Sequence, residues 1–491
     1  MSRLPRPLSA DGRSFDALNR HDRTADPAAD HIGLPGALPE GEGLLGARVD
    51  YDAHSPVRLS GPEAHSLADH RRRFGPRPSA AGTAADTLLD TLDRIRLAGR
   101  GGAHFPAAVK WRAALSAGGG GTVVANAAEG EPASAKDAAL LQHRTHLVLD
   151  GLACAAEAIG ADRAVVWLHA GAHSTHRALT RALAERRSAG LRDPHVELVT
   201  GPDAYLSGES SAIIRALSGG PTLPTFRRVP AARSGIGGRP ALVHNVETLA
   251  RVALAARTGA DDHRDSTLVT VVSDGRRTVL ELDPATTVAQ ALAVAAVPAG
   301  AAGRTVGAGL PPEQRHAPLR AVHDPVSGTA GEPQAILLGG YGGGWLPWDQ
   351  AADLRLEHRA LREAGTGLGA GILAVLPAGV CGLQQTALIA DYLAGSGARQ
   401  CGPCLFGLRD VADLMLDLAA GRAGRSDVRR LERFAGEIEG RGGCHHPDGV
   451  VRLVRTALDT FADHVDEHLR QGRCLLPEAR LPFPVPPGPQ A

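Results

Sequence analysis

At 491 residues the chain is too long for a single ordinary hydrophobic core, so we expect two to four domains. Apolar residues make up 43% of the chain and charged residues 22%, as in globular proteins that fold in water. The 53 Lys and Arg residues balance 53 Asp and Glu residues, which gives no support to a basic nucleic-acid-binding surface. The sequence has no apolar run of membrane-spanning length and no apolar signal-peptide core, and we therefore expect a cytoplasmic protein without membrane insertion.

Residues 1–55 are rich in Pro, Gly, Asp and Arg and lack periodicity, which predicts a loosely ordered arm. Residues 86–97 have the apolar spacing of a helix, and a glycine-rich turn follows them, made of Gly99, Arg100, Gly101 and Gly102. Glycine tolerates positive φ, so such a turn can point several N–H groups at one anion.

Lys110 would lie one turn into the next helix if that helix begins near Pro106, and its charge would add to that of the helix N-terminus. Phe105 offers a flat apolar face beside the turn. Lysine occurs elsewhere only at Lys136, so both positions are candidates for a specific point charge. Together these features indicate a nucleotide or flavin site, and a plain glycine-rich surface loop is the alternative.

Strand-like and helix-like segments alternate after this turn. We expect strands at residues 122–125, 164–168 and 195–199, and helices at residues 147–158 and 173–188, which predicts a parallel sheet covered on both faces. Asn126, Glu129 and Glu131 follow the first of these strands, where α/β sheets bind ligands. A solvated acidic turn is the alternative interpretation.

Two later segments have the same polar character. Glu209 precedes a helix-like run, and Asn245, Glu247 and Thr248 follow a strand-like run. Helix capping is the alternative role for these side chains. From residue 267 the pattern changes to a hairpin (268–272 and 278–282), a short helix (287–295) and a strand (335–338), which together predict a small β-grasp-like domain.

Cysteines gather near the C-terminus among segments that read as helical, at residues 411–419 and 450–468. Cys401 and Cys404 form a C-x-x-C pair, with Cys444 and Cys474 further along. Four thiolates fit structural zinc or an iron–sulfur cluster equally well by spacing. His445 and His446 beside Cys444 keep zinc open, while Cys154 and Cys381 have the apolar surroundings of buried thiols.

The order of these motifs resembles the FMN- and NADH-binding flavoprotein of respiratory complex I, the F-subunit family of NADH-quinone oxidoreductase, whose relatives serve NAD-linked hydrogenases and formate dehydrogenases. The resemblance covers about residues 85–475 and rests on GRGGAHFPAAVKW, NAAEGEP, YLSGES, HNVET and CGPC. It implies an α/β fold with a Rossmann-like FMN/NADH-binding domain at 56–262 and a β-grasp (SLBB-like) domain at 263–348. A helical bundle with a [4Fe–4S] cluster would span 349–475, before a Pro-rich tail at 476–491.

The resemblance also implies roles for individual residues. Glu131 and Glu209 would be the catalytic carboxylates at the NADH site, and Cys401, Cys404 and Cys444 would bind the cluster. The cofactor-binding residues would be Gly99, Arg100, Gly101, Gly102, Phe105, Lys110, Asn126, Glu129, Asn245, Glu247 and Thr248. NADH would pass hydride to FMN, and electrons would leave singly through the cluster to a ferredoxin-like, quinone-linked or other partner subunit.

Five positions depart from the family pattern. Relative to the family, His104 replaces a glycine, Ala128 and Ser210 each replace a carboxylate, Arg112 replaces an aromatic residue, and Ala398 replaces the first cluster cysteine. These losses support FMN binding more than NADH oxidation, so a protein that no longer uses NADH is one alternative and a zinc-stapled scaffold another. We expect Cys474 to supply the fourth cluster ligand, with Cys381 as second choice.

Overall fold

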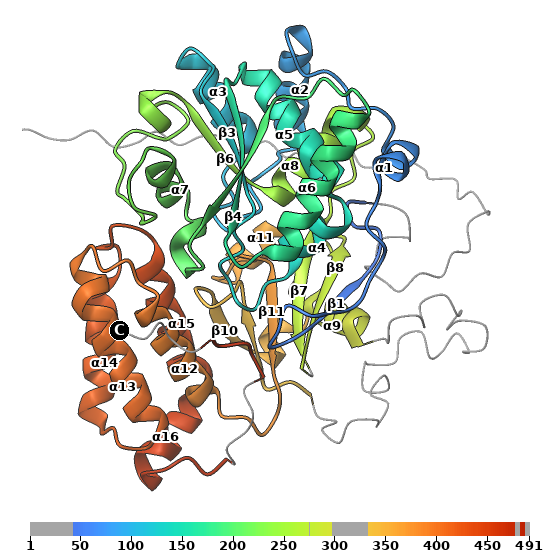
Figure 1. Ribbon diagram of the computed structural model, residues 1–491. Coiled ribbons are helices and arrows are strands. Elements are labelled where there is room, and N and C mark those ends of the chain that lie inside the picture. The colour runs from blue at the N-terminus through green and yellow to red at the C-terminus, as the bar shows by residue number, and fades with distance from the viewer. Residues whose placement is uncertain (1–42, 274, 297–331, 477–481, 487–491) are drawn as a thin grey trace, which may run out of the picture. The chain divides into compact units, whose positions relative to one another are not determined.

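The computed structural model describes residues 43–273, 275–296, 332–476 and 482–486 (Figure 1). This part of the chain contains two β-sheets and a C-terminal group of helices. No helix within these ranges has both the length and the apolar character needed to cross a bilayer.

The first sheet has four parallel strands in the order β5-β4-β3-β6, which confirms the expected parallel sheet. Its strands are β3 (Thr122–Asn126), β4 (Arg163–His169), β5 (Val196–Gly201) and β6 (Ala241–Asn245). Side chains alternate between the faces of a strand, so Val123 packs with one set of helices and Val124 with another.

Helices cover both faces of this sheet (Figure 1). One face packs against α7 (Ser210–Leu217), which follows the 3₁₀ turn Tyr205–Gly208. The larger core on the other face belongs to α2 (Thr83–Arg94), α3 (Ala107–Ser116), α4 (Lys136–His143), α5 (Thr145–Ile159), α6 (His173–Ser188) and α8 (Val246–Thr258), and α1 (Leu67–Phe74) lies at its edge.

The second sheet has seven strands in the order β10-β9-β11-β7-β8-β1-β2. The predicted hairpin is present as β7 (Thr267–Ser273) and β8 (Arg276–Leu282), and residue 274 in its turn lies outside the described ranges. The other strands are β1 (Val49–Asp52), β2 (Arg58–Ser60), β9 (Ala335–Leu338), β10 (Gly344–Pro347) and β11 (Ile372–Leu376), with α9 (Val288–Ala296), α10 (Trp348–Ala351) and α11 (His358–Glu363) beside them. The SLBB-like assignment stays a prediction.

The prediction of a loosely ordered arm is wrong for residues 43–55, and residues 1–42 lie outside the described ranges. Strand β1 pairs antiparallel with β8, so a segment without periodicity of its own gains its partner from more than 200 residues away. Leu44 and Leu45 are buried, and their N–H groups donate to the Glu281 carboxylate at 2.8 Å. This segment is part of the second sheet and its core.

The C-terminal helices form the predicted bundle (Figure 1). They are α12 (Gly382–Gly395), α13 (Leu408–Ala419), α14 (Arg425–Ile438), α15 (His446–Thr460) and α16 (Ala462–Gln471). The segment 450–468 that reads as one helix is divided at Phe461, whose backbone leaves helical geometry (φ −111°, ψ 30°) while its ring packs on Trp345. This break redirects α16 across the end of the bundle.

Candidate functional site

A cavity of about 600 Å³ lies where strands β3 and β6 end, and the bundle forms part of its wall. It brings together nearly every residue predicted to bind FMN or NADH: Gly99, Arg100, Gly101, Gly102, Phe105, Lys110, Asn126, Glu129, Glu131, Glu209, Asn245 and Thr248. The cavity wall also includes Ala128 and Ser210, the two positions where the family pattern has carboxylates.

The glycine turn joins α2 to α3, which begins at Ala107 as expected. Its ends are tied by the Gly99 N–H, which donates to the Phe105 carbonyl at 2.9 Å, and the Arg100 N–H donates to Thr248 Oγ1 at 2.9 Å. Gly102 has φ +102°, a conformation that favours glycine. Within the described residues the N–H groups of Gly101 and Gly102 have no protein acceptor, so they are available to a ligand.

Lys110 extends from α3 into the cavity, where its Nζ donates to the Val243 carbonyl at 2.9 Å. Burial lowers the pKa of Lys110 to about 8. Among the described residues no carboxylate forms an ion pair with this amine. A buried amine without a protein counter-ion is suited to an anionic ligand.

His244, on β6, is a cavity residue that the sequence did not single out by function. Its Nε2 accepts a hydrogen bond of 2.8 Å from Trp111 Nε1, and burial holds the pKa of His244 well below its usual value. The ring is therefore neutral and fixes the start of α3 against β6. The feature of the sequence that could have pointed to His244 is its place in the HNVET motif.

Two residues of the turn after β3 hold its shape. Asn126 Nδ2 donates to the Gly208 carbonyl at 2.8 Å, and Asn126 Oδ1 accepts from the Ala128 N–H at 3.2 Å. Glu129 accepts from the N–H groups of Asp137 and Ala138, and so caps the start of α4. The turn is built by these bonds and is only partly exposed, so it is no plain solvated loop.

Glu131 lies against the loop between β9 and β10. Its carboxylate accepts a 2.5 Å bond from the Tyr205 hydroxyl and a 3.1 Å bond from the Tyr341 N–H. Burial raises the pKa of Glu131, and a Cβ at Gly340 would come within 2.9 Å of the carboxylate. The loop therefore needs a glycine to admit this side chain.

Glu209 is the N-cap of α7, where its Oε2 accepts from the N–H groups of Ser211 (2.7 Å) and Ala212 (3.1 Å). The capping interpretation of Glu209 is thus confirmed, and the residue also lines the cavity. Both carboxylates predicted at the NADH site share the wall formed by the 3₁₀ turn Tyr205–Gly208 and its neighbours.

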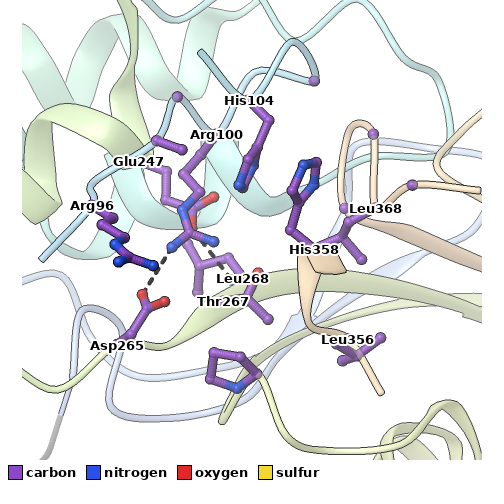
Figure 2. Close-up of a pocket in the computed structure, with 17 residues that line it drawn as sticks. Arg96, Arg100, His104, Glu247, Asp265, Thr267, Leu268, Leu356, His358 and Leu368 are labelled. Carbon is purple, nitrogen blue, oxygen red and sulfur yellow. Dashed lines mark hydrogen bonds and ion pairs between the residues drawn. The ribbon is translucent and has the colours of Figure 1, made fainter. Parts of the chain in front are cut away.

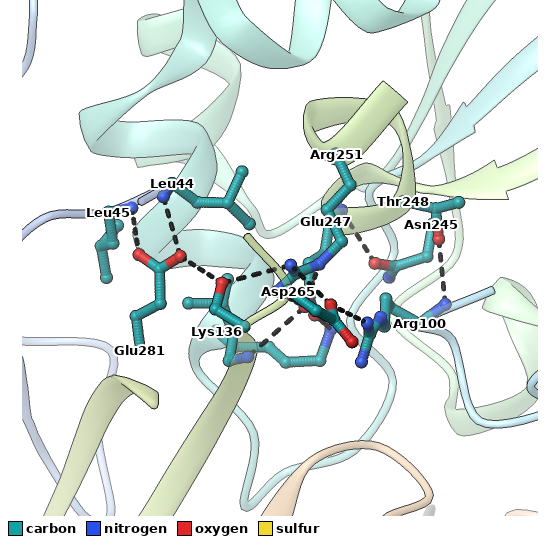
Figure 3. A network of polar contacts seen from close by, with 12 residues as sticks. Leu44, Leu45, Arg100, Lys136, Asn245, Glu247, Thr248, Arg251, Asp265 and Glu281 are labelled. Carbon is teal, nitrogen blue, oxygen red and sulfur yellow. Dashed lines mark hydrogen bonds and ion pairs between the residues drawn. The ribbon is translucent and has the colours of Figure 1, made fainter. Parts of the chain in front are cut away.

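Glu247 lies outside the large cavity, in a buried network of charges (Figure 3). Its carboxylate pairs with Lys136 at 3.1 Å and with Arg251 at 2.9 Å, and all three side chains are buried. These cations outweigh burial and hold the pKa of Glu247 at about 2. Asn245, the N-cap of α8, joins the network by donating from Nδ2 to Asp137 at 2.5 Å. Glu247 supports the cavity wall from behind.

A smaller cavity of about 150 Å³ lies on the other side of the glycine turn (Figure 2). His104, the departure at the sixth motif position, has φ +49° and stacks on His358 with ring centroids 3.8 Å apart. Burial and nearby positive groups lower the pKa of His104 to about 4. The Arg100 side chain points into this cavity and donates to Asp265 at 2.8 Å. The ring that His104 adds at its position packs beside the glycine turn, in the same cavity.

Three of the predicted metal ligands lie together. Cys404 is carried by the π-helical turn Pro403–Gly407 and is hydrogen-bonded to Cys401. Burial raises the pKa of Cys444, and the nearby Cys404 and Cys401 thiols contribute to this rise. Cys444 also lines the large cavity. Beside it the buried His446 donates from Nε2 to the Leu393 carbonyl at 2.9 Å.

The assignment of Cys474 to this cluster is wrong. Cys474 lies with Cys381 and His468, with the three ligand atoms within 4.8 Å of one another. Cys381 precedes α12, whereas Cys404 packs against Gly397 just beyond its end, and 14 helical residues span about 21 Å. Cys474 follows α16, which returns to the far end of the bundle.

The sulfur atoms of Cys401, Cys404 and Cys444 do not all lie within 4.8 Å of one another. A tetrahedral zinc with Zn–S bonds of about 2.3 Å holds its sulfur ligands about 3.8 Å apart. In the described part of the chain, the one group of three ligand atoms within 4.8 Å is the Cys381 group. In an iron–sulfur cluster each thiolate binds a different iron, so wider spacing fits Cys401, Cys404 and Cys444.

Comparisons with known proteins match both halves of this arrangement. The family model described as the Nuo51 FMN-binding domain matches residues 92–254. The model described as the NADH-ubiquinone oxidoreductase-F iron-sulfur binding region matches residues 380–468. The first range contains most of the cavity residues, and the second contains Cys401, Cys404 and Cys444 but excludes Cys474.

Individual relatives align with most of the chain. NADP-reducing hydrogenase subunit HndC of Solidesulfovibrio fructosivorans is 27% identical over 400 residues, which cover 79% of this chain and 77% of HndC. The F subunit of NADH-quinone oxidoreductase from Streptomyces coelicolor is 27% identical over 431 residues, which cover 84% of this chain and 90% of that subunit. The crystal structure of an NAD+-reducing [NiFe]-hydrogenase in the air-oxidized state superposes with a TM-score of 0.67 at 25% identity, over 84% of this chain and 69% of that one.

Proposed function

Since the chain matches both family models and the F subunit of NADH-quinone oxidoreductase over most of its length, we propose that it is a member of that family. Its large cavity would hold FMN beside NADH, and Cys401, Cys404 and Cys444 would hold a [4Fe–4S] cluster. The protein is then an NADH-oxidising electron-transfer subunit. One observation carries the proposal: Cys444 lines the same cavity as Lys110 and the glycine turn. A flavin in that cavity would share a wall with a ligand of the cluster.

The residues present fit FMN. The N–H groups of Gly101 and Gly102 and the amine of Lys110 have no acceptor or counter-ion of their own among the described residues, apart from the Val243 carbonyl, and they suit a phosphate-bearing ligand. When bound, FMN accepts two electrons as hydride and releases them singly, which is the chemistry that links a nicotinamide to an iron–sulfur cluster. We assign Gly99, Arg100, Phe105, Asn126 and Asn245 to the same binding surface.

The chain itself contributes positioning and charge. Tyr205 and the Tyr341 N–H fix the Glu131 carboxyl in this wall, and burial raises its pKa. Glu209 keeps its position through the start of α7. Three cysteines would leave one iron of a bound cluster without a thiolate, because Ala398 stands where the family has its first cluster cysteine.

We also propose the class of protein that accepts the electrons. We assign it to an electron-transfer partner subunit, ferredoxin-like or quinone-linked, because the relatives named above are subunits of larger enzymes.

The test of the flavin site uses full-length protein purified without oxygen, with FMN content and the absorption spectrum recorded before and after NADH. Gly101→Val should lose the flavin. A Cβ at this position would lie 3.3 Å from Asn245 Cβ, and the two methyl groups beyond it would enter the space of the ligand. The matched control is Gly436→Val on the exposed surface of α14, which should retain FMN. Full FMN content in Gly101→Val would place the site elsewhere.

A second variant separates NADH from FMN. Glu209→Gln keeps an amide oxygen for the capping bonds of α7 but loses the negative charge, so the apparent affinity for NADH should change while FMN content stays constant. Wild-type flavin that neither NADH nor NADPH bleaches would contradict NADH oxidation and leave a flavin and iron–sulfur carrier.

A further inference from the structure

A second group of metal-ligand residues lies at the far end of the bundle from the proposed cluster. Cys381 and His468 are buried and Cys474 is partly exposed, and their ligand atoms lie within 4.8 Å of one another. The Cys381 sulfur is 3.6 Å from His468 Nε2 and within hydrogen-bonding reach of the Cys474 thiol. These residues come from the start of α12, from α16 and from the segment after α16.

The orientation of His468 leaves a lone pair for a ligand. Its Nδ1 is 3.0 Å from the Leu418 carbonyl, and a carbonyl oxygen can only accept, so Nδ1 carries the proton in the neutral ring. Nε2 is then unprotonated and faces the sulfur of Cys381. Histidines that ligate zinc commonly donate their second ring N–H to a backbone carbonyl in this way.

The backbone around both cysteines is fixed by close packing. A Cβ at Gly382, next to Cys381, would come within 2.3 Å of the Phe461 ring. A Cβ at Gly421 would come within 2.4 Å of the Arg473 nitrogen, so the loop after α13 holds the segment that carries Cys474. Two N–H groups at the start of α12 also bond to the Cys381 sulfur, although burial raises the pKa of this thiol overall.

We propose that Cys381, His468 and Cys474 form a zinc site of the Cys₂His type that fastens the segment after α16 to the start of α12. Two thiols lose their protons to solvent as two Zn–S bonds form, with no change of oxidation state. Ligand atoms within 4.8 Å need to approach by only about 1 Å to reach the spacing of about 3.8 Å set by zinc. The exposed side of Cys474 admits water as the fourth ligand.

The test measures zinc and iron together, by elemental analysis of full-length protein purified without oxygen and loaded with Zn²⁺ alone. The wild type should hold about one tightly bound zinc per chain in addition to cluster iron. Cys474→Ser and His468→Gln should each reduce zinc at least about tenfold while iron and flavin stay unchanged. Cys401→Ser should show the reverse pattern, and Cys154→Ser, a buried thiol outside both groups, should alter neither metal.

Zinc X-ray absorption of the wild type keeps the test valid if a variant fails to fold. Two sulfur neighbours at about 2.3 Å with nitrogen in the remaining shell would support the site. Zinc with only oxygen and nitrogen neighbours, a wild type without bound zinc, or zinc retained by Cys474→Ser would overturn it. A Cys381–Cys474 disulfide found by mass spectrometry in protein kept from oxygen would also overturn it, and loss of iron with Cys474→Ser would restore that residue to the cluster.

Discussion

The amine of Lys110 gives a direct test of whether an anion occupies the cavity. In the protein without FMN, burial lowers the pKa of Lys110 from 10.5 to about 8, and the only bonded partner in the described chain is the Val243 carbonyl. A bound FMN phosphate would stabilise the ammonium and raise this pKa again. FMN binding and protonation of Lys110 should therefore favour each other.

The pKa shift sets the size of the effect. A difference of about 2.5 pKa units corresponds to at most about 3.4 kcal/mol, since one unit is worth 1.36 kcal/mol. The affinity for FMN should then fall by up to about 300-fold as the pH rises from 8 to 10.5, because binding must re-protonate the amine. Below pH 8 the amine is already charged, so this contribution is constant.

The stability of the FMN-free protein should change in the opposite direction. Between pH 8 and 10.5 the unfolded chain binds the Lys110 proton and the folded chain does not, so the unfolding free energy rises with pH by at most about 3.4 kcal/mol. Lys110→Met should remove this slope, because the variant has no amine to titrate.

The assay uses the fact that the chain has only two lysines. Carbon-13 labelling of the lysine Cε atoms should give two NMR signals whose shifts report the charge of each amine. Although burial by itself would lower it, the Asp137 and Glu247 carboxylates raise the pKa of Lys136, which should stay charged throughout and serve as the internal control. Titration of Lys110 at its usual pKa without FMN, or a titration that FMN leaves unchanged, would refute the coupling between FMN and this amine.

Three further predictions address the support of the cavity and the cluster. Glu247→Gln removes the charge that pairs with Lys136 and Arg251, and we expect a loss of about 3–5 kcal/mol in unfolding free energy, measured by urea denaturation; an unchanged midpoint would contradict the network. Gly208→Ala places a Cβ 2.6 Å from the Ala128 carbonyl oxygen, so NADH affinity should fall more than FMN content, and equal loss of both would contradict the assignment of this wall to NADH. Cys401→Ser should lower iron content while NADH still bleaches the flavin, and normal iron would remove this ligand.

Short-range patterns predicted the elements and the glycine turn well. The apolar spacing of residues 173–188 defined α6 with both of its ends, and the alternation of strands and helices predicted the parallel sheet. Pro106 and the glycines before it placed the start of α3 and Lys110 within one turn. These features depend on neighbouring residues, whose backbone preferences act locally.

The roles of the polar motif residues were less evident from the sequence. Glu209 and Asn245 cap helices while also lining the cavity, so helix capping and a role in ligand binding are compatible for both residues. Glu247 belongs to the motif but faces a buried network of cations, because Lys136 reaches it from the start of α4 and Arg251 lies one turn further along α8. Motif spacing cannot show toward which side of a wall a side chain points.

Sequence alone determined the fold class, the family resemblance and the chemistry of the glycine turn, because each depends on ordered local motifs. Tertiary structure decided which distant segments meet. Strand β1 finds its partner in β8, and Cys474 lies with Cys381 because the break at Phe461 turns α16 away from the cluster. Cysteine spacing along the chain could not separate these two groups, since packing between helices, and not distance in sequence, sets which sulfur atoms come together.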